Sequence, residues 1–145
     1  ALVDHTATET GNFRYGLMLR RTAEDKFYAF TISPRQNMWQ VLKSSPAGIT
    51  PLAEGPISGL RGLAPAGITP DNTDKLRVDA VGSKFIYQIN NQPVIQVTDA
   101  DYPSGEVGFY VENFDETLSH IHYEMLLVKK VDPAKLVSAP TPQAK

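Results

Sequence analysis

The sequence predicts an all-β domain built from two packed antiparallel sheets, and three observations lead to this prediction. Apolar and polar residues alternate in short runs rich in aromatic and β-branched side chains, as in half-buried strands. Turn residues separate many of these runs at roughly the 8–12-residue spacing that is typical of sandwiches. The chain has 145 residues, the usual size of one domain with one hydrophobic core.

The first strands are predicted at residues 1–8, 14–21, 26–33 and 37–43. In the third of them, Tyr28, Phe30 and Ile32 share one face, because successive side chains of a strand point to opposite faces. We expect this face to be part of the core.

The later strands are predicted at residues 75–81, 84–89, 92–98, 106–112 and 119–130. Leu76, Val78 and Ala80 alternate with charged residues, so the first of these strands is expected to have one face in the core and one in water. Asn90 and Asn91 tolerate the positive φ angles of a tight turn and predict a hairpin there.

The alternation stops between residues 44 and 73, where Gly, Pro, Ser and Ala dominate. The hexapeptide at 46–51 recurs letter for letter at 65–70, which indicates a duplication within a loop. We therefore predict a sandwich domain over residues 1–131 with a long loop insertion at 44–73. Residues 132–145 are predicted to form an extended linker or tail.

Composition excludes several classes of protein. A formal net charge of −2 offers no basic surface for nucleic acid. No stretch approaches the roughly 18 consecutive apolar residues of a membrane-spanning helix. The absence of cysteine excludes disulfides and thiolate chemistry, and no glycine-rich phosphate loop or nucleophile elbow occurs. No cofactor enzyme is expected.

Several segments in order resemble a known superfamily: residues 15–20, 26–32, 76–82, 89–94, 105–110 and 114–116. Together they resemble the concanavalin A-like lectin and glucanase superfamily over nearly the whole chain up to Val131. The resemblance implies an antiparallel two-sheet jelly roll of the kind that bacteria append to lipoproteins, anchored kinases and sugar-processing proteins. Such domains normally have further strands before the one at 2–8, so the resemblance also implies a sheet completed by another chain or segment.

The predicted function is noncatalytic binding of a carbohydrate or a protein surface, in an extracytoplasmic or cell-surface location. Aromatic rings bind sugars by covering their apolar C–H faces, and polar side chains hold the hydroxyl groups. The only tryptophan is the first candidate, although its alternative is packing in the core. The predicted ligand-binding residues are Trp39, Arg20, Gln40, Tyr28 and Tyr110.

Two weaker candidates concern metal ions. His120, His122 and Glu124 lie at alternate positions of one predicted strand, where a solvated outer face is the alternative to a zinc site. Asp99 and Asp101 lie beside a turn and offer carboxylates of the kind that bind calcium. We predict no required cofactor, with calcium as the ion to test.

Two other functions stay open at this point. An accessory subunit would dock onto a larger assembly through the 44–73 loop and a sheet edge, because exposed apolar loops favour association. A glycoside hydrolase would need two carboxyl groups about 5–10 Å apart, and the superfamily's Glu-x-Asp-x-x-Glu type of signature is absent from every predicted strand.

Overall fold

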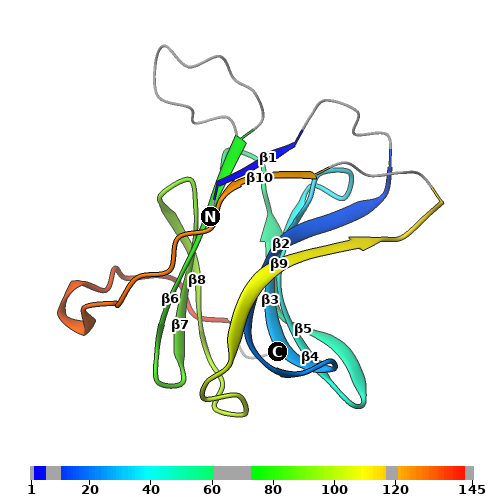
Figure 1. The fold of residues 1–145 in the computed structure, drawn as a ribbon. Helices are drawn as coiled ribbons and strands as arrows, with labels where there is room; N and C mark the ends of the chain where they lie inside the picture. Colours follow the sequence, from blue (N-terminus) through cyan, green and yellow to red (C-terminus); the bar gives the residue numbers. More distant parts are fainter. Residues whose placement is uncertain (1, 6–10, 61–72, 117–120, 143–145) are drawn as a thin grey trace.

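The computed structural model describes residues 2–5, 11–60, 73–116 and 121–142 and shows two antiparallel sheets packed face to face (Figure 1). The front sheet has the order β5-β4-β3-β2-β9. Its strands are β2 (Phe13–Ala23), β3 (Lys26–Ser33), β4 (Met38–Ser45), β5 (Gly48–Pro56) and β9 (Glu106–Asn113). The back sheet has the order β10-β1-β6-β7-β8. Its strands are β1 (Leu2–His5), β6 (Thr73–Val81), β7 (Lys84–Ile89), β8 (Gln92–Thr98) and β10 (Ile121–Met125).

The core lies between the sheets and is rich in aromatic rings. Tyr28, Phe30 and Ile32 of β3 are buried in it, and Leu76 faces them from β6, with Val78 and Ala80 packed alongside. The apolar faces of both strands lie in the core as predicted, but Asp79, on the face of β6 predicted to lie in water, is buried. Alternation is sufficient there because each strand has one face against the opposite sheet.

The prediction of a long loop insertion at 44–73 is wrong for its first half, which contains β5. This strand pairs with β4 from Met38–Pro56 to Ser45–Gly48, with a register shift between Val41 and Leu42. It is an edge strand, where prolines and glycines are tolerated because one side needs no ladder partner. Residues 61–72 of the predicted insertion lie outside the described part.

The prediction of a last strand over 119–130 is too long, because β10 ends at Met125. The chain then crosses the outer side of the back sheet, as Figure 1 shows. A short 3-10 helix, η1 (Pro133–Lys135), follows, capped by the Asp132 side chain. The Gln96 amide on β8 donates a 2.6 Å hydrogen bond to the Pro140 carbonyl, so this part of the predicted tail packs against the domain.

Turn chemistry follows the sequence. Asn90 and Asn91 have φ angles of 50° and 66° and connect β7 to β8, which confirms the predicted hairpin. In the described residues, no helix is long and apolar enough to cross a membrane.

Candidate functional site

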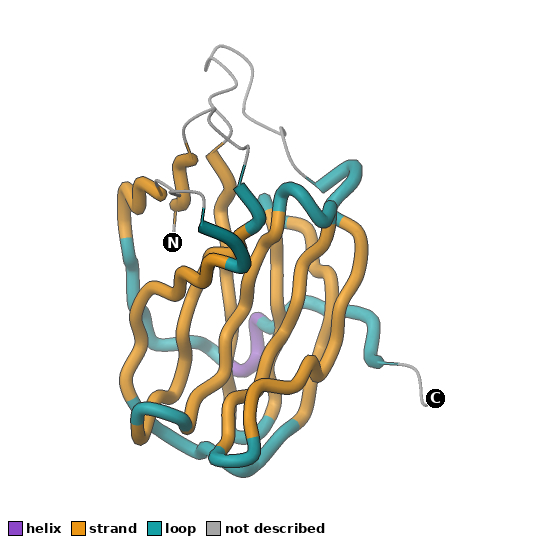
Figure 2. Tube along the Cα trace, turned by 90° about the vertical axis from the view of Figure 1, so that its right-hand side faces the viewer, coloured by secondary structure: helices purple, strands orange, loops and turns teal. Residues whose placement is uncertain are grey.

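Five polar side chains form a chain of contacts across the outer face of the front sheet, the face turned toward the viewer in Figure 2. The strand register places these residues on one face, because Arg14 is opposite Glu112, Gly16 is opposite Tyr110, and Gln40 is opposite Glu54. We call the group the Arg14 cluster: Arg14, Gln40, Glu54, Tyr110 and Glu112.

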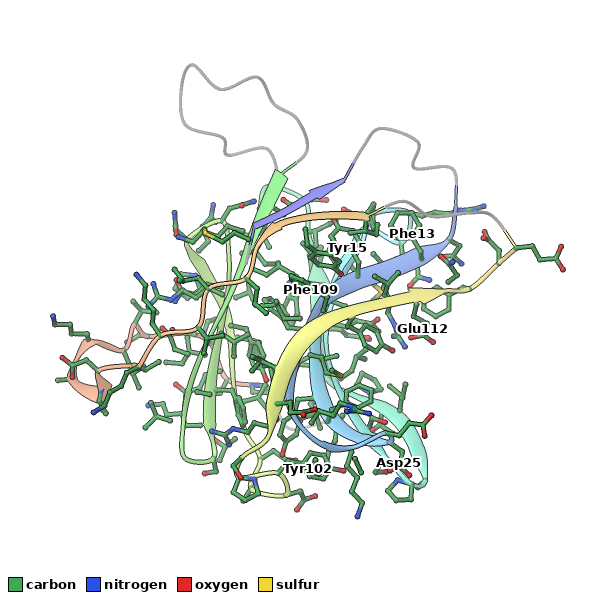
Figure 3. The ribbon with its side chains drawn as sticks, in the orientation of Figure 1. Phe13, Tyr15, Asp25, Tyr102, Phe109 and Glu112 are labelled. Atoms are coloured by element: carbon green, nitrogen blue, oxygen red, sulfur yellow. The ribbon has the colours of Figure 1, made fainter. Side chains whose placement is uncertain are left out.

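Hydrogen bonds hold the Arg14 cluster together across four strands. Arg14 Nε donates to Glu112 Oε2 at 2.8 Å, and Arg14 Nη1 donates to Gln40 Oε1 at 3.0 Å. Gln40 Nε2 then donates to Glu54 at 3.0 Å, and the Tyr110 hydroxyl donates to Glu112 at 2.6 Å. Figure 3 shows Glu112 on the outer side of β9, opposite Phe109. The arrangement pre-orients donors and acceptors on one surface.

Small residues lie between these polar groups. Gly16 on β2 pairs with Thr31 on β3, and Thr31 pairs with Gln40 on β4, so glycine and threonine occupy the middle of the row that ends at Tyr110 and Glu54. Thr31 Oγ1 is buried and, among the described residues, is the side-chain polar atom that lacks a hydrogen-bond partner. A buried polar atom without a hydrogen-bond partner costs stability.

The Arg14 cluster contains one cation, Arg14, and two carboxylates, Glu54 and Glu112. The Arg14 side chain is 11% exposed and the Glu112 side chain is 33% exposed, so their 2.6 Å ion pair is partly shielded from water. The Arg14 guanidinium also lies 5.0 Å from the centre of the Phe114 ring. Burial, together with the hydrogen bond to Glu112, raises the pKa of Tyr110 to about 12, so its hydroxyl stays a donor at neutral pH.

An apolar row borders the Arg14 cluster on the same face. Phe27, Ala29 and Leu42 are buried there and pack against Met18 and Tyr110. The Phe27 and Tyr110 rings lie 5.8 Å apart. Tyr110 therefore lies where an apolar row meets a polar row. A sugar has both apolar C–H faces and polar hydroxyl groups, which these two rows can contact.

The structure brings two predicted ligand-binding residues, Gln40 and Tyr110, onto this face. It places Trp39 on the opposite face of β4, in the core, with its indole against Gly55 of β5. Tyr28 is also a core residue. The structure therefore places Trp39 and Tyr28 in the core and not on this face, and each ring is almost completely buried.

Arg20 also lies away from the Arg14 cluster. It has a φ angle of 51° at an irregularity in β2, and its Nη1 donates to the carbonyls of Gly82 at 2.6 Å and Tyr102 at 3.2 Å. Its guanidinium packs 4.5 Å from the Phe85 ring centre. Arg20 thus connects the two sheets, and its predicted role in ligand binding stays a prediction.

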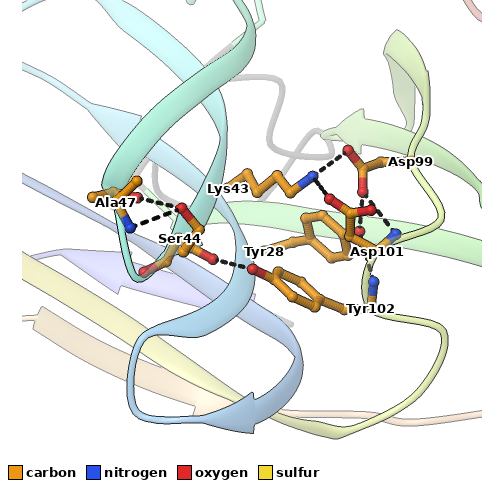
Figure 4. A network of polar contacts seen from close by, with 9 residues as sticks. Tyr28, Lys43, Ser44, Ala47, Asp99, Asp101 and Tyr102 are labelled. Atoms are coloured by element: carbon orange, nitrogen blue, oxygen red, sulfur yellow. Dashed lines mark hydrogen bonds and ion pairs between the residues drawn. The ribbon is translucent and has the colours of Figure 1, made fainter.

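Asp99 and Asp101 form an ion-pair network around Lys43, shown in Figure 4. Lys43 Nζ is 2.8 Å from Asp99 and also contacts Asp101, and the Tyr28 hydroxyl donates to Asp99. The Lys43 ammonium thus occupies the position between the two carboxylates that calcium would need, which argues against the predicted calcium candidates. We call Tyr28, Lys43, Asp99, Asp101 and Tyr102 the Lys43 cluster.

The predicted zinc candidates are not tested by these contacts. His120 lies outside the described residues, and so do the side chains of His122 and Glu124. Among the described residues, no group of three or more His, Cys, Asp or Glu side chains is placed to hold a metal ion.

Sequence reasoning names Arg14 only as one of several residues that could add polar contacts, and it does not bring Arg14, Glu54 and Glu112 together in one site. Arg14 and Glu112 lie on predicted strands, but the pairing of β2 with β9 is a long-range contact that alternation does not reveal. Glu54 lies in the segment predicted as a loop. One sequence signal could have pointed to the site: Arg14 is a charged residue between two aromatic residues at the start of a predicted strand, and charged residues are seldom buried without a partner.

Comparison with known proteins supports the fold. No family model matches the chain, and no curated protein matches it by sequence. Among solved structures, the carbohydrate-binding module CBM66 from Bacillus subtilis is similar, with a TM-score of 0.60 and 16% sequence identity. The match covers 77% of this chain and 63% of that chain, so the likeness spans less than two thirds of the module. The chain therefore has an all-β fold of two antiparallel sheets that is similar to the fold of this module.

Proposed function

We propose that the chain is a noncatalytic, extracytoplasmic binding domain of the concanavalin A-like superfamily that holds a neutral carbohydrate on the outer face of its front sheet. The Arg14 cluster is the observation that carries this proposal. Its hydrogen-bonded side chains present donors and acceptors at fixed positions beside an apolar row, which suits the hydroxyl groups and C–H faces of a sugar. The similarity to a carbohydrate-binding module supports the same function.

A neutral glycan fits the charges better than an acidic one. Arg14 is the cation of the cluster, and it is already paired with Glu112, while Glu54 adds a second carboxylate. A sugar carboxylate or sulfate placed there would meet Glu54 and Glu112 and would be repelled.

The test is binding of soluble neutral polysaccharides, namely β-glucan, xylan, mannan, galactan and fructan, measured by affinity electrophoresis and calorimetry. We expect at least one to bind, and we expect Arg14→Ala and Gln40→Ala each to weaken its binding about tenfold or more, equivalent to about 1.4 kcal/mol. Arg21→Ala is the matched control, because Arg21 forms an exposed ion pair with Glu106 elsewhere on β2. Absence of binding across the panel, or equal losses in the control, would contradict the proposal.

Because Arg14 is largely buried, its replacement can also unfold the protein, and Tyr110→Phe separates the two effects. This change removes the hydroxyl that donates to Glu112 while keeping the ring against Phe27. We expect an unchanged circular dichroism spectrum and about threefold to tenfold weaker binding. The same samples assayed for release of reducing ends test the hydrolase alternative, for which we expect no turnover.

Alkaline pH is expected to destabilise the fold. Burial raises the pKa of Tyr28, Tyr110 and Tyr123 to about 12, above the ordinary value of 10.0. A raised pKa in the folded state stabilises the protein below the unfolded value, and this stabilisation is lost as pH rises from about 10 toward 12. Urea midpoints measured between about pH 8 and pH 12 should fall across this window. A flat profile would show that these hydroxyls ionise equally in both states.

A further inference from the structure

The Thr31 hydroxyl occupies a buried position in the middle of the Arg14 cluster. Phe30 and Ile32, its neighbours in β3, face the core, so the Thr31 side chain is on the outer face of the front sheet. Thr31 pairs with Gly16 on β2 and with Gln40 on β4, and it is 1% exposed. Among the described residues its Oγ1 atom has no hydrogen-bond partner, and such an atom calls for a physical explanation.

The residues beside Thr31 on β2 and β3 do not supply that partner. Gly16 has no side chain, and Ala29, two residues along β3 on the same face, is apolar. Ser33 lies two residues along β3 in the other direction, about 6–7 Å away, and donates its hydroxyl to the Phe13 carbonyl at 2.9 Å. The polar side chain directly opposite Thr31 is therefore the one on β4.

That side chain, Gln40, is engaged at both ends in this structure. Its Oε1 accepts from Arg14 Nη1 at 3.0 Å, and its Nε2 donates to Glu54 at 3.0 Å. Directly opposite residues of an antiparallel pair have Cβ atoms about 4.5–5.5 Å apart, and a threonine hydroxyl rotates to suit an acceptor. Arg14 is thus the donor at Gln40 Oε1, an atom that the Thr31 hydroxyl is placed to serve.

We infer that Thr31 is a positioning residue for carbohydrate binding, which donates to Gln40 Oε1 when Arg14 Nη1 turns to a sugar hydroxyl. The inference rests on the proposed function, because it needs a ligand that draws the guanidinium away from Gln40. Without a second donor, Gln40 Oε1 would be left unpaired beneath the ligand, which costs affinity. With the Thr31 hydroxyl as donor, the Gln40 amide stays aligned with Glu54 in the complex. Thr31 acts through Gln40 and does not touch the sugar, because its own oxygen is covered.

The test is Thr31→Val, which keeps the branched shape and removes the hydroxyl. Calorimetry uses whichever of β-glucan, xylan, mannan, galactan and fructan binds the wild type, and we expect about fivefold to tenfold weaker binding. The urea midpoint should be unchanged or higher, because the lost hydroxyl has no partner in the unbound protein. Thr31→Ser, which keeps the hydroxyl, should bind as tightly as the wild type to within about twofold. Affinity and stability thus move independently, which a purely structural role would not produce.

Ser44→Ala is the matched control, because Ser44 is a buried hydroxyl on the same face of β4, outside the Arg14 cluster, that donates to the Asp25 carbonyl at 2.9 Å. We expect it to lower the urea midpoint and to leave the affinity unchanged.

A double variant tests whether Thr31 acts through Gln40. Thr31→Val added to Gln40→Ala should weaken binding no further than Gln40→Ala alone, because the acceptor is already gone. Additive losses would overturn the inference, and so would a lower urea midpoint for Thr31→Val, which would show a hydroxyl already bonded in the unbound protein. Binding by the wild type with equal affinity for Thr31→Val would overturn this inference alone. Absence of wild-type binding across the panel would overturn the proposed function together with it.

Discussion

Replacing Gly16 with alanine is expected to lower the free energy of unfolding by about 3 kcal/mol or more, a large effect for one added methyl group. A Cβ atom at Gly16 would lie 1.9 Å from the Phe30 carbonyl oxygen and 3.0 Å from Thr31 Cα. Both contacts are with backbone, which cannot rotate away as a side chain can. β2 and β3 would have to separate in the middle of the front sheet.

Gly108→Ala is the matched control, because Gly108 lies in the same sheet, on β9, opposite Met18. A Cβ atom there would meet Met18 Cε at 3.4 Å, an ordinary contact with the end of a flexible side chain. We expect its stability to be unchanged or higher by up to about 1 kcal/mol, since glycine disfavours strands. Urea denaturation of the two variants and the wild type compares the two sites. Similar stability for Gly16→Ala and wild type would show that β2 and β3 can separate at little cost.

The Arg14 cluster shows why the fold of this protein is easier to predict from the sequence than its candidate site. Alternation identifies β2, β3 and β6, because each places one row of side chains against the opposite sheet. It says nothing about which strands are neighbours. The Arg14 cluster forms because β2 lies between β9 and β3 in the front sheet. This strand order brings Arg14 and Glu112 into contact although 98 positions separate them in the sequence.

The aromatic candidates fail for a related reason. Trp39 and Gln40 are adjacent in β4, so one must face the core and the other the outer surface. Sequence reasoning favours Trp39 because exposed rings bind sugars, but in this sandwich the largest apolar side chain is used in the core. β5 escapes prediction because an exposed edge strand needs neither alternation nor β-branched residues to pair with β4.

Replacing Lys43 with methionine is the second large effect that we expect, a loss of about 2–3 kcal/mol. Methionine keeps the aliphatic stem but removes the ammonium that lies 2.8 Å from Asp99 and also contacts Asp101. Removing one partner of a fully buried ion pair costs about 3–5 kcal/mol. The Lys43 and Asp99 side chains are each 17% exposed, so water compensates part of that cost. The Asp99 carboxylate would retain the hydrogen bonds that the Tyr28 hydroxyl and the Asp101 amide donate to it.

The acid side of the stability profile distinguishes loss of this charge pair from simple loss of packing. Burial alone would raise the pKa of Asp99, but the hydrogen bonds from Lys43 and Tyr28 outweigh it and lower the pKa below 3.8. A lowered pKa in the folded state stabilises the protein above the unfolded value, and this contribution disappears as pH falls through the folded value. In Lys43→Met the acid-dependent loss should be smaller than in wild type, because much of the contribution is already gone. Adding Asp99→Asn to Lys43→Met should restore part of the stability, since no unpaired carboxylate then remains at that position. Equal acid profiles, or additive losses in the double variant, would show that the Lys43 cluster contributes packing alone.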